Sequence, residues 1–140
     1  MGTAGSLSLL PKSIDKEILV INGDVLSDID FSKLLNFHLK KSNSVTLCAK
    51  NYEVSIPFAV LDNNDGLLCD IQEKPSFTYL INAGVYVLSP SSLQMIPREF
   101  YNLTELISQL LEKSKPVSVF PLHEVWEDLG TIDSLANSNK

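Results

Sequence analysis

The sequence predicts an α/β fold with a mixed, mostly parallel sheet and helices on both of its faces. Apolar runs of strand length alternate with amphipathic helical stretches in the first half of the chain. The pattern of an antiparallel hairpin follows in the middle. With 140 residues the chain is long enough for one hydrophobic core, so we expect residues 1–140 to form a single domain.

The first half of the chain has the pattern of a helix, a strand, a second helix and a second strand. Small residues followed by leucines predict a helix over residues 2–10. The apolar run at residues 17–21 predicts a central strand buried on both faces, and it ends at the turn signal Asn22-Gly23-Asp24. Leucines at helical spacing predict a helix over 31–41, and residues 44–49 return to a strand. This order is typical of a parallel crossover unit.

The second half begins with an antiparallel hairpin. Residues 56–61 and 67–72 are predicted to be its two strands, and the turn-forming segment Asn63-Asn64-Asp65-Gly66 lies between them. The same criteria then predict a strand over residues 80–88, a helix over 103–113 and a strand over 117–121. An edge strand or loop is expected at 126–131 and a final helical turn at 132–137.

Composition and charge exclude several classes of protein. The net charge is −6, from 11 basic and 17 acidic residues, which argues against a general affinity for nucleic acid. No apolar run approaches the roughly 20 residues of a membrane span, and no signal peptide is evident. Cys48 and Cys69 lie in apolar stretches without metal-binding spacing, so we expect two buried, reduced thiols. These features predict a cytoplasmic protein without nucleic-acid or membrane partners.

Two acidic residues are candidates for binding one divalent cation. Asp24 follows the predicted strand at 17–21, and ligands of open α/β sheets gather beyond the carboxyl ends of strands. Asp128 follows Trp126 near the C-terminus. Mg²⁺ commonly takes one or two protein carboxylates and completes its shell with substrate phosphate and water. Taken singly, Asp24 could simply belong to a turn and Asp128 could be a surface acid.

Two further motifs suit a sugar phosphate. Lys74, in Glu73-Lys74-Pro75, provides an ammonium that can neutralise a phosphate, and Glu73 can accept hydrogen bonds from sugar hydroxyls. Asn82-Ala83-Gly84 places an amide and a glycine within a predicted strand. That glycine indicates close backbone approach by a ligand, a bulge, or a plain packing requirement. Each motif is weak in isolation, because an exposed Glu-Lys pair is usually solvated surface.

In their order along the chain, these motifs resemble those of the sugar-1-phosphate nucleotidylyltransferases. The resemblance is strongest to the mannose-1-phosphate guanylyltransferase-like and glucose-1-phosphate thymidylyltransferase-like branches, and it extends from Gly2-Thr3-Ala4-Gly5 to Trp126-Glu127-Asp128-Leu129-Gly130-Thr131. It implies a partial Rossmann-like nucleotide-diphospho-sugar transferase fold. It also implies transfer of a nucleotidyl group from a nucleoside triphosphate to a sugar 1-phosphate, which supports polysaccharide or glycolipid assembly.

The resemblance also implies roles for particular residues. Asp24 and Asp128 would hold Mg²⁺, and Lys74 would hold the sugar phosphate. Glu73 and Asn82 would bind sugar hydroxyls. The remaining substrate-binding residues would lie near the nucleotide base or line the pocket: Gly2, Thr3, Ala4, Gly84, Val85 and Trp126.

Two features depart from the family pattern. The chain has no glycine-rich loop with a trailing Arg or Lys, which would bind the triphosphate. We therefore expect a C-terminal portion of a nucleotidyltransferase domain that is inactive alone and exposes a sheet edge, through which it could form a homodimer. In addition, Ala59 stands where the family usually has a glycine beside the sugar.

Two alternatives remain open from the sequence. One is a non-catalytic module that binds or senses a sugar nucleotide, although a pure sensor needs no pair of metal-binding acids. The other is a metal-dependent glycosyltransferase, because Asp28-Ile29-Asp30 matches the Asp-x-Asp pattern of those enzymes. Asp30 is better explained as the N-cap of the helix at 31–41.

Overall fold

The computed structural model describes residues 2–128, which form two compact units. The first unit comprises the described residues up to Ala49 and from Asn82 onward, and the second comprises Lys50–Ile81. Strands β3 (Val45–Ser55) and β6 (Ser76–Leu88) run through both units. Whether the two units act as the single domain expected from the sequence stays a prediction.

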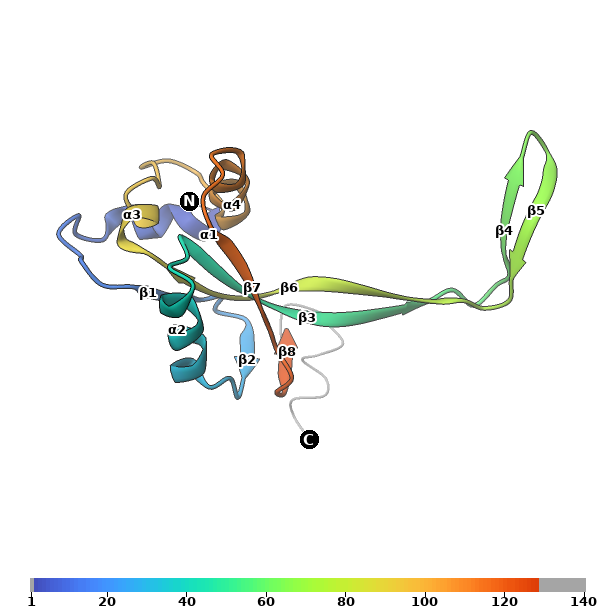
Figure 1. Ribbon diagram of the computed structural model, residues 1–140, viewed down its shortest axis with the longest axis horizontal. Coiled ribbons are helices and arrows are strands. Elements are labelled where there is room, and N and C mark those ends of the chain that lie inside the picture. Colours follow the sequence, from blue (N-terminus) through green and yellow to red (C-terminus); the bar gives the residue numbers. More distant parts are fainter. Residues whose placement is uncertain (1, 129–140) are drawn as a thin grey trace. The chain divides into compact units, whose positions relative to one another are not determined.

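The main sheet has four described strands in the order β1-β6-β3-β7 (Figure 1). Strand β1 (Ile18–Ile21) pairs antiparallel with β6, whereas β3 pairs parallel with β7 (Val117–Pro121). Two short antiparallel pairs accompany this sheet: β2 (Val25–Ser27) with β8 (Trp126–Asp128), and β4 (Val60–Asn64) with β5 (Leu67–Gln72).

The predicted α/β class and mixed sheet are confirmed, but the expectation of mostly parallel pairing is wrong. Antiparallel pairs predominate, because β6 returns from a hairpin directly into the sheet instead of through a crossover helix. Strand β6 therefore separates β1 from β3, the two strands expected to form an adjacent parallel pair.

Strand β1 is also not the central strand that its apolar run predicted. It lies at one edge of the described sheet, with β6 as its neighbour. Its side chains alternate between half-buried and exposed, and Leu19 and Ile21 are each 43% exposed. An apolar run of strand length indicates what could be buried, but it does not specify which strands lie beside it.

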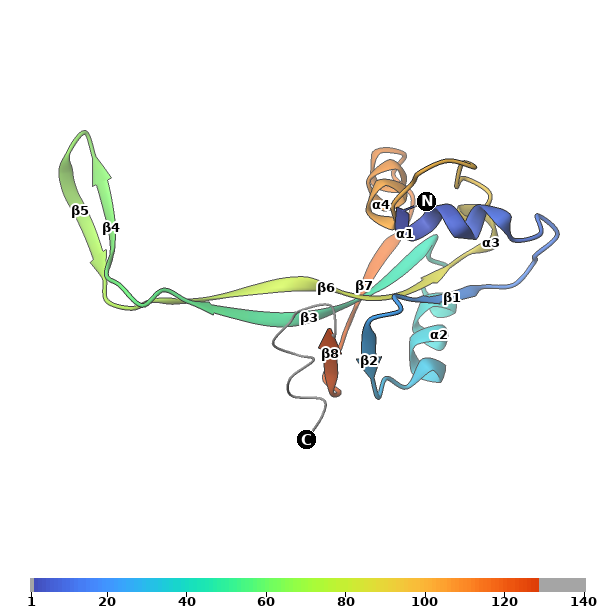
Figure 2. The ribbon, with the colours of Figure 1, turned by 180° about the vertical axis from the view of Figure 1, so that it is seen from behind.

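Helices cover both faces of the sheet, as expected. Figure 1 and the reverse view in Figure 2 show α2 (Phe31–Lys40) on one side, with the remaining helices on the other. Those are α1 (Gly2–Gly5), α3 (Pro90–Leu93) and α4 (Leu103–Glu112). The expected helix over 2–10 continues beyond α1 only as a 3₁₀ turn, Ser6–Leu9, because Leu10 is extended before Pro11. Within residues 2–128, no helix combines the length and apolarity needed to cross a membrane.

Strand β6 separates two hydrophobic clusters by the alternation of its side chains. Tyr86 and Leu88 pack into the cluster that includes residues of α1, α3 and α4. Val85 and Val87 pack into the cluster that includes Leu34 of α2. Because successive strand residues point to opposite faces, one continuous buried strand supports both layers of helices.

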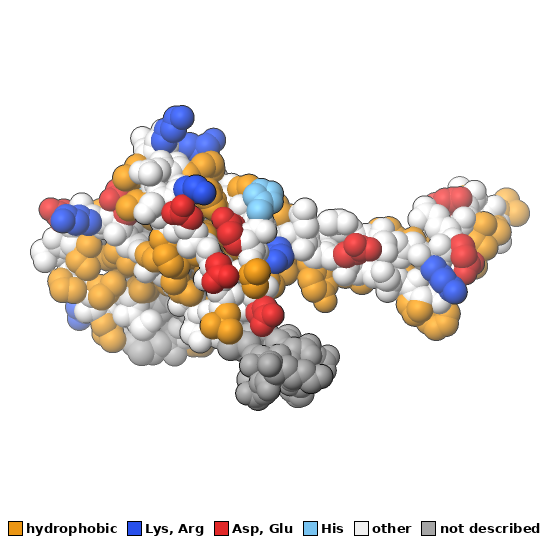
Figure 3. All heavy atoms as spheres, turned by 90° about the horizontal axis from the view of Figure 1, so that it is seen from below, with side chains coloured by type: hydrophobic (Ala, Val, Ile, Leu, Met, Phe, Trp, Pro, Cys, Tyr) orange, Lys and Arg blue, Asp and Glu red, His pale blue; other side chains and the backbone are white. Residues whose placement is uncertain are grey.

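The second unit contains the predicted hairpin. Its two-residue turn has positive φ angles at Asp65 (48°) and Gly66 (84°), the conformation that favours Asp-Gly in tight hairpins. No described residue between Lys50 and Ile81 is buried, and Phe58 is 73% exposed. Figure 3 shows hydrophobic side chains, in orange, on the surface of this unit. Cys69 is therefore exposed, contrary to expectation, whereas Cys48 is fully buried.

A buried polar network predicts a pH dependence of stability. His38 in α2 is 1% exposed, and its Nδ1 lies 2.9 Å from the Thr46 hydroxyl oxygen, which also accepts a hydrogen bond from the Asn43 amide. Burial lowers the pKa of His38 below its usual value of 6.5. The unfolded chain therefore binds the proton more readily, and stability is lost as the pH falls below about 6.5.

We expect the free energy of unfolding, measured by urea denaturation, to be lower at pH 5.5 than at pH 7.5. The loss amounts to at most ~1.4 kcal/mol per pH unit until the folded pKa is reached. His38→Gln keeps a polar group beside Thr46 but does not titrate, so its pH dependence in this range should be weaker. An equal pH dependence in both proteins would contradict the assignment to His38.

The two thiols should differ in reactivity. Burial raises the pKa of the Cys48 thiol to about 12, whereas Cys69 is exposed on β5. Since the thiolate is the reactive form, iodoacetamide at pH 8 should modify the native chain at Cys69 alone. Mass spectrometry of peptides would locate the label, and Cys69→Ser should abolish fast labelling. Fast modification of Cys48 in the native protein would show that the reagent reaches the hydrophobic cluster around this residue.

Candidate functional site

The turn after β1 holds the first candidate metal-binding acid. The backbone N–H of Asn22 donates to the carbonyl oxygen of Gly84 at 2.9 Å, and that of Val25 donates to the Asn22 carbonyl oxygen at 3.2 Å. These bonds close a tight turn against β6. The turn leaves Asp24 exposed to solvent, so its carboxylate is available to a ligand.

Gly84 is the position on β6 that allows this contact. Its φ is +72°, and a Cβ atom there would lie 2.9 Å from Asn22 Nδ2 and 3.0 Å from Val25 Cγ2. The sequence predicted a close approach at this glycine, a bulge, or a packing requirement. The structure shows a packing requirement, and the approaching group is the turn that carries Asp24.

The pairing of β2 with β8 brings the second candidate acid to the same place. The Cα of Asp128 is the cross-strand partner of Val25, the residue after Asp24. Trp126, opposite Ser27, donates a hydrogen bond from its Nε1 to the carbonyl oxygen of Ala83 at 2.7 Å. Three of the four motifs therefore converge in the first unit: the turn after β1, the start of the buried part of β6, and β8.

Magnesium binding by Asp24 and Asp128 stays a prediction. Within residues 2–128 no cluster of three or more His, Cys, Asp or Glu side chains is placed to hold a metal. The register of β2 and β8 instead makes the backbones of Asp24 and Asp128 neighbours. Mg²⁺ commonly takes one or two protein carboxylates and keeps sites for water and phosphate, which is the basis of that prediction.

The amide of Asn82 is held by β6 itself. Its Nδ2 donates to Tyr86 Oη at 2.7 Å, and its Oδ1 accepts from the Gly84 N–H at 3.0 Å. Burial raises the pKa of Tyr86, so the phenol stays protonated. Asn82 is exposed and keeps one N–H for a ligand. Val85, another candidate, is fully buried toward α2, so it supports the strand from beneath.

An open groove of about 670 Å³ connects the N-terminal motif with Asp24. Thr3 contributes to one part of its lining, and Asn22, Gly23 and Asp24 contribute to another. The remaining lining residues come from the 3₁₀ turn and β1: Ser6, Leu7, Leu19, Val20 and Ile21. The structure thus places the expected base-binding segment and the expected metal-binding acid on one groove. Ala4 is fully buried in the hydrophobic cluster that includes residues of α4.

Sequence reasoning missed the residues that hold this segment. The Ala4 N–H donates to the Tyr101 carbonyl oxygen at 3.0 Å, and the Thr3 N–H donates to Asn102 Oδ1 at 3.2 Å. In return, the Leu103 N–H donates to the Thr3 hydroxyl at 3.1 Å. Asn before an amphipathic helix indicates an N-cap, but nothing in the sequence links it to a segment about 100 residues away.

Glu73 and Lys74 lie in the second unit, after β5. Lys74 has a φ of +43°, and the Ile56 N–H donates to the carbonyl oxygen of the following Pro75 at 3.0 Å. Lys74 is exposed and its backbone is held in the left-handed region, an uncommon conformation for a residue other than glycine. The structure describes these residues within their own unit, so their expected place beside the sugar phosphate stays a prediction.

Comparison with known proteins agrees with the resemblance seen in the motifs. The family model described as nucleotidyl transferase matches residues 1–140. The mannose-1-phosphate guanyltransferase of Debaryomyces hansenii is 32% identical over 138 residues, covering 93% of this chain and 38% of the relative. The glucose-1-phosphate adenylyltransferase of Bacillus subtilis is 30% identical over 155 residues, covering 99% and 41%.

A solved structure supports the fold. The crystal structure of HddC from Yersinia pseudotuberculosis aligns with a TM-score of 0.67 and 22% identity, over 97% of this chain and 60% of that one. The chain spans about two fifths of the length of the curated relatives it matches. Because the family model covers every residue and the relatives are named for sugar 1-phosphates, the chain belongs to the nucleotidyl transferase family, among its sugar-1-phosphate members.

Proposed function

We propose that this chain provides the sugar-nucleotide side of a nucleotidyltransferase that joins a nucleoside triphosphate to a sugar 1-phosphate. The observation that supports it best is the groove shared by Thr3 and Asp24, with the backbone of Asp128 beside the same turn. A groove with a polar segment at Thr3 in one part and the carboxylate of Asp24 in another can accept a base and a metal-bound diphosphate together. The named activities of the relatives supply the substrate class.

The proposed reaction needs positioning more than acid–base chemistry. An oxygen of the sugar phosphate attacks the α-phosphorus of the triphosphate. The new P–O bond forms as the bond to the β-phosphate oxygen breaks, and pyrophosphate leaves with that electron pair. The nucleophile is already anionic, so no strong base is required. Asp24 and Asp128 would hold Mg²⁺, which supplies positive charge to the phosphates when bound.

Lys74 and Asn82 are proposed to act on the sugar phosphate side. The exposed ammonium of Lys74 can pair with the phosphate, and the carboxylate of Glu73 can accept hydroxyl hydrogen bonds. The remaining N–H of Asn82 can donate to a sugar oxygen while Tyr86 and Gly84 fix the amide. All three roles follow from the family resemblance and from side chains left accessible.

The glycosyltransferase alternative is less well supported. Asp30 caps α2 by accepting a hydrogen bond from the Lys33 N–H at 3.1 Å, and it forms an ion pair with the Lys33 ammonium at 3.5 Å. Both contacts explain this acid structurally. Asp28 does not line the groove that contains Asp24. A binding module that lacks turnover would use the same groove, and an assay of pyrophosphate release separates it from a catalyst.

We expect the chain to bind GDP-mannose or ADP-glucose more tightly with Mg²⁺ than without it, and Asp24→Ala to abolish this gain. The reason is that Asp24 is the accessible carboxylate on the groove. Isothermal titration calorimetry at fixed ionic strength measures the effect, which should be about 10-fold or more for a charged ligand contact.

Asp28→Ala is the matched control, because it removes the same group a few residues away. It should leave Mg²⁺-dependent binding intact. If Asp28→Ala abolishes the metal effect and Asp24→Ala does not, the glycosyltransferase assignment is favoured. If the unaltered chain binds neither sugar nucleotide at millimolar concentration, the groove is not a sugar-nucleotide site.

Lys74→Met should weaken binding of the same sugar nucleotide by about 10- to 100-fold, because one charge-assisted contact contributes ~1.5–3 kcal/mol. Lys33→Met changes the net charge equally at an exposed position on α2 and is the control. Calorimetry at two salt concentrations separates a local contact from general attraction. Equal weakening by both substitutions would show that Lys74 acts only through net charge.

A further inference from the structure

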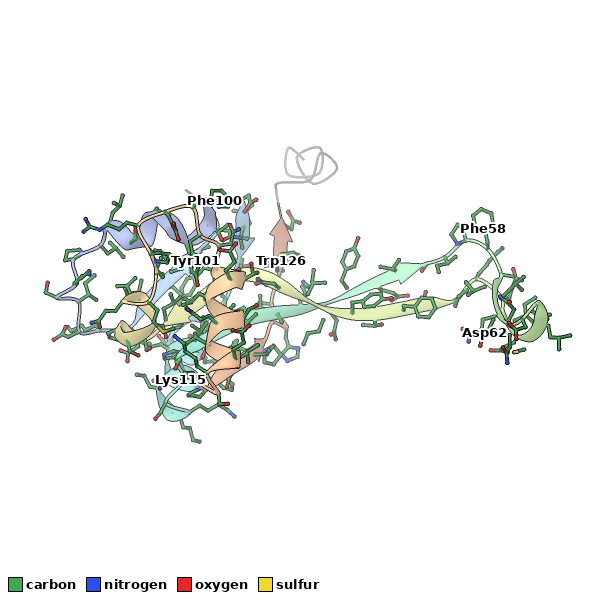
Figure 4. All side chains as sticks on the ribbon, turned by 90° about the horizontal axis from the view of Figure 1, so that it is seen from above. Phe58, Asp62, Phe100, Tyr101, Lys115 and Trp126 are labelled. Atoms are coloured by element: carbon green, nitrogen blue, oxygen red, sulfur yellow. The ribbon has the colours of Figure 1, made fainter. Side chains whose placement is uncertain are left out.

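The N-terminus of α4 and the segment Gly2–Ala4 form a reciprocal set of hydrogen bonds. Tyr101, labelled beside the start of α4 in Figure 4, accepts from Ala4, and Asn102 Oδ1 accepts from the Thr3 N–H. The Thr3 hydroxyl accepts from Leu103, whose N–H lies in the first turn of α4 and has no partner within the helix. Each segment thus provides hydrogen-bond partners for backbone groups of the other.

The contact is too close for a side chain at residue 2. Gly2 has a φ of +69°, and a Cβ atom there would collide with the Tyr101 carbonyl oxygen and lie 2.9 Å from Asn102 Oδ1. The glycine therefore serves the approach of the segment to α4. Packing against α4 therefore explains why residue 2 is a glycine, independently of any ligand.

Glu105 fixes which atom of the Asn102 amide faces Thr3. The Asn102 Nδ2 donates to Glu105 Oε1 at 3.3 Å, and the Asn102 backbone N–H donates to Glu105 Oε2 at 3.3 Å. With the amide turned over, its oxygen would face a carboxylate and its NH₂ would face the N–H of Thr3. Both contacts would be repulsive, so the carboxylate directs Oδ1 toward Thr3.

We propose that Asn102, oriented by Glu105, is a positioning residue for nucleotide binding. This inference rests on the proposed function of the groove. Thr3 lines the groove that contains Asp24, while Asn102 and Glu105 do not line it. Asn102 therefore acts through Thr3: it sets the position of the segment that meets the nucleotide. A misplacement of about 1 Å at such a segment is enough to weaken binding measurably.

Asn102→Ala tests this proposal, because it removes the acceptor for Thr3 without touching the groove. We expect the dissociation constant for GDP-mannose or ADP-glucose, whichever binds the unaltered chain, to rise by about 5- to 20-fold, the effect of one lost hydrogen bond with local displacement. The double variant Asn102→Asp with Glu105→Gln exchanges donor and acceptor between the two side chains. It should restore the affinity to within about 2-fold.

A matched control separates positioning from loss of stability. Ser89 caps α3 by accepting a hydrogen bond from the Ser92 N–H, so Ser89→Ala removes a helix cap of the same kind. It should lower the melting temperature comparably and leave the dissociation constant unchanged. Unaltered affinity in Asn102→Ala, or equal weakening in Ser89→Ala, would overturn the proposal.

Amide hydrogen exchange distinguishes failure of this inference from failure of the proposed function. Exchange at Thr3 and Ala4 should be at least about 5-fold faster in Asn102→Ala than in the unaltered chain, and unchanged in Ser89→Ala. If no sugar nucleotide binds the unaltered chain, the proposed function fails and this inference fails with it, even if amide exchange at Thr3 and Ala4 is faster in Asn102→Ala. If the nucleotide binds but Asn102→Ala leaves amide exchange at Thr3 and Ala4 unchanged, Asn102 does not hold the segment. In that case this inference alone fails.

Discussion

The arrangement of the site depends on the close contact between Gly84 and the turn after β1. At this point β6 carries no side chain, so Asn22 can donate to the Gly84 carbonyl oxygen and Val25 can pack above it. A Cβ at residue 84 would overlap this turn. Because β2 starts directly from the turn, the same contact fixes where β2 pairs with β8 and hence where Asp128 lies.

Core and site are parts of the same strand. From Val85 to Leu88, β6 alternates between the two hydrophobic clusters, whereas Asn82 and Ala83 provide the amide and the acceptor for Trp126. The packing of β6 between two layers of helices therefore positions polar groups where the buried part of this strand begins. A site on a buried strand is held more rigidly than one on a loop, which suits a reaction that depends on orientation.

Local features of the fold were predictable from the sequence, but neighbour relations were not. The cap at Asp30 and the turn at Asp65-Gly66 follow from backbone chemistry within a few residues. The edge position of β1 does not, because an apolar run carries no information about its partners. The contact between Thr3 and Asn102 was equally hidden, since ordinary polar residues distant in sequence give no local signal.

Two parts of the groove are held in physically different ways. Thr3 is held by several separate hydrogen bonds to the start of α4, each contributing about 1 kcal/mol, so substitutions there can change its position in small steps. Asp24 lies in a turn that packs against Gly84, where an added Cβ would require the side chains of Asn22 and Val25 to shift. The expected base-binding segment is thus held by several bonds that can be changed one at a time, whereas the turn that carries Asp24 depends on the absence of a side chain at one residue, Gly84.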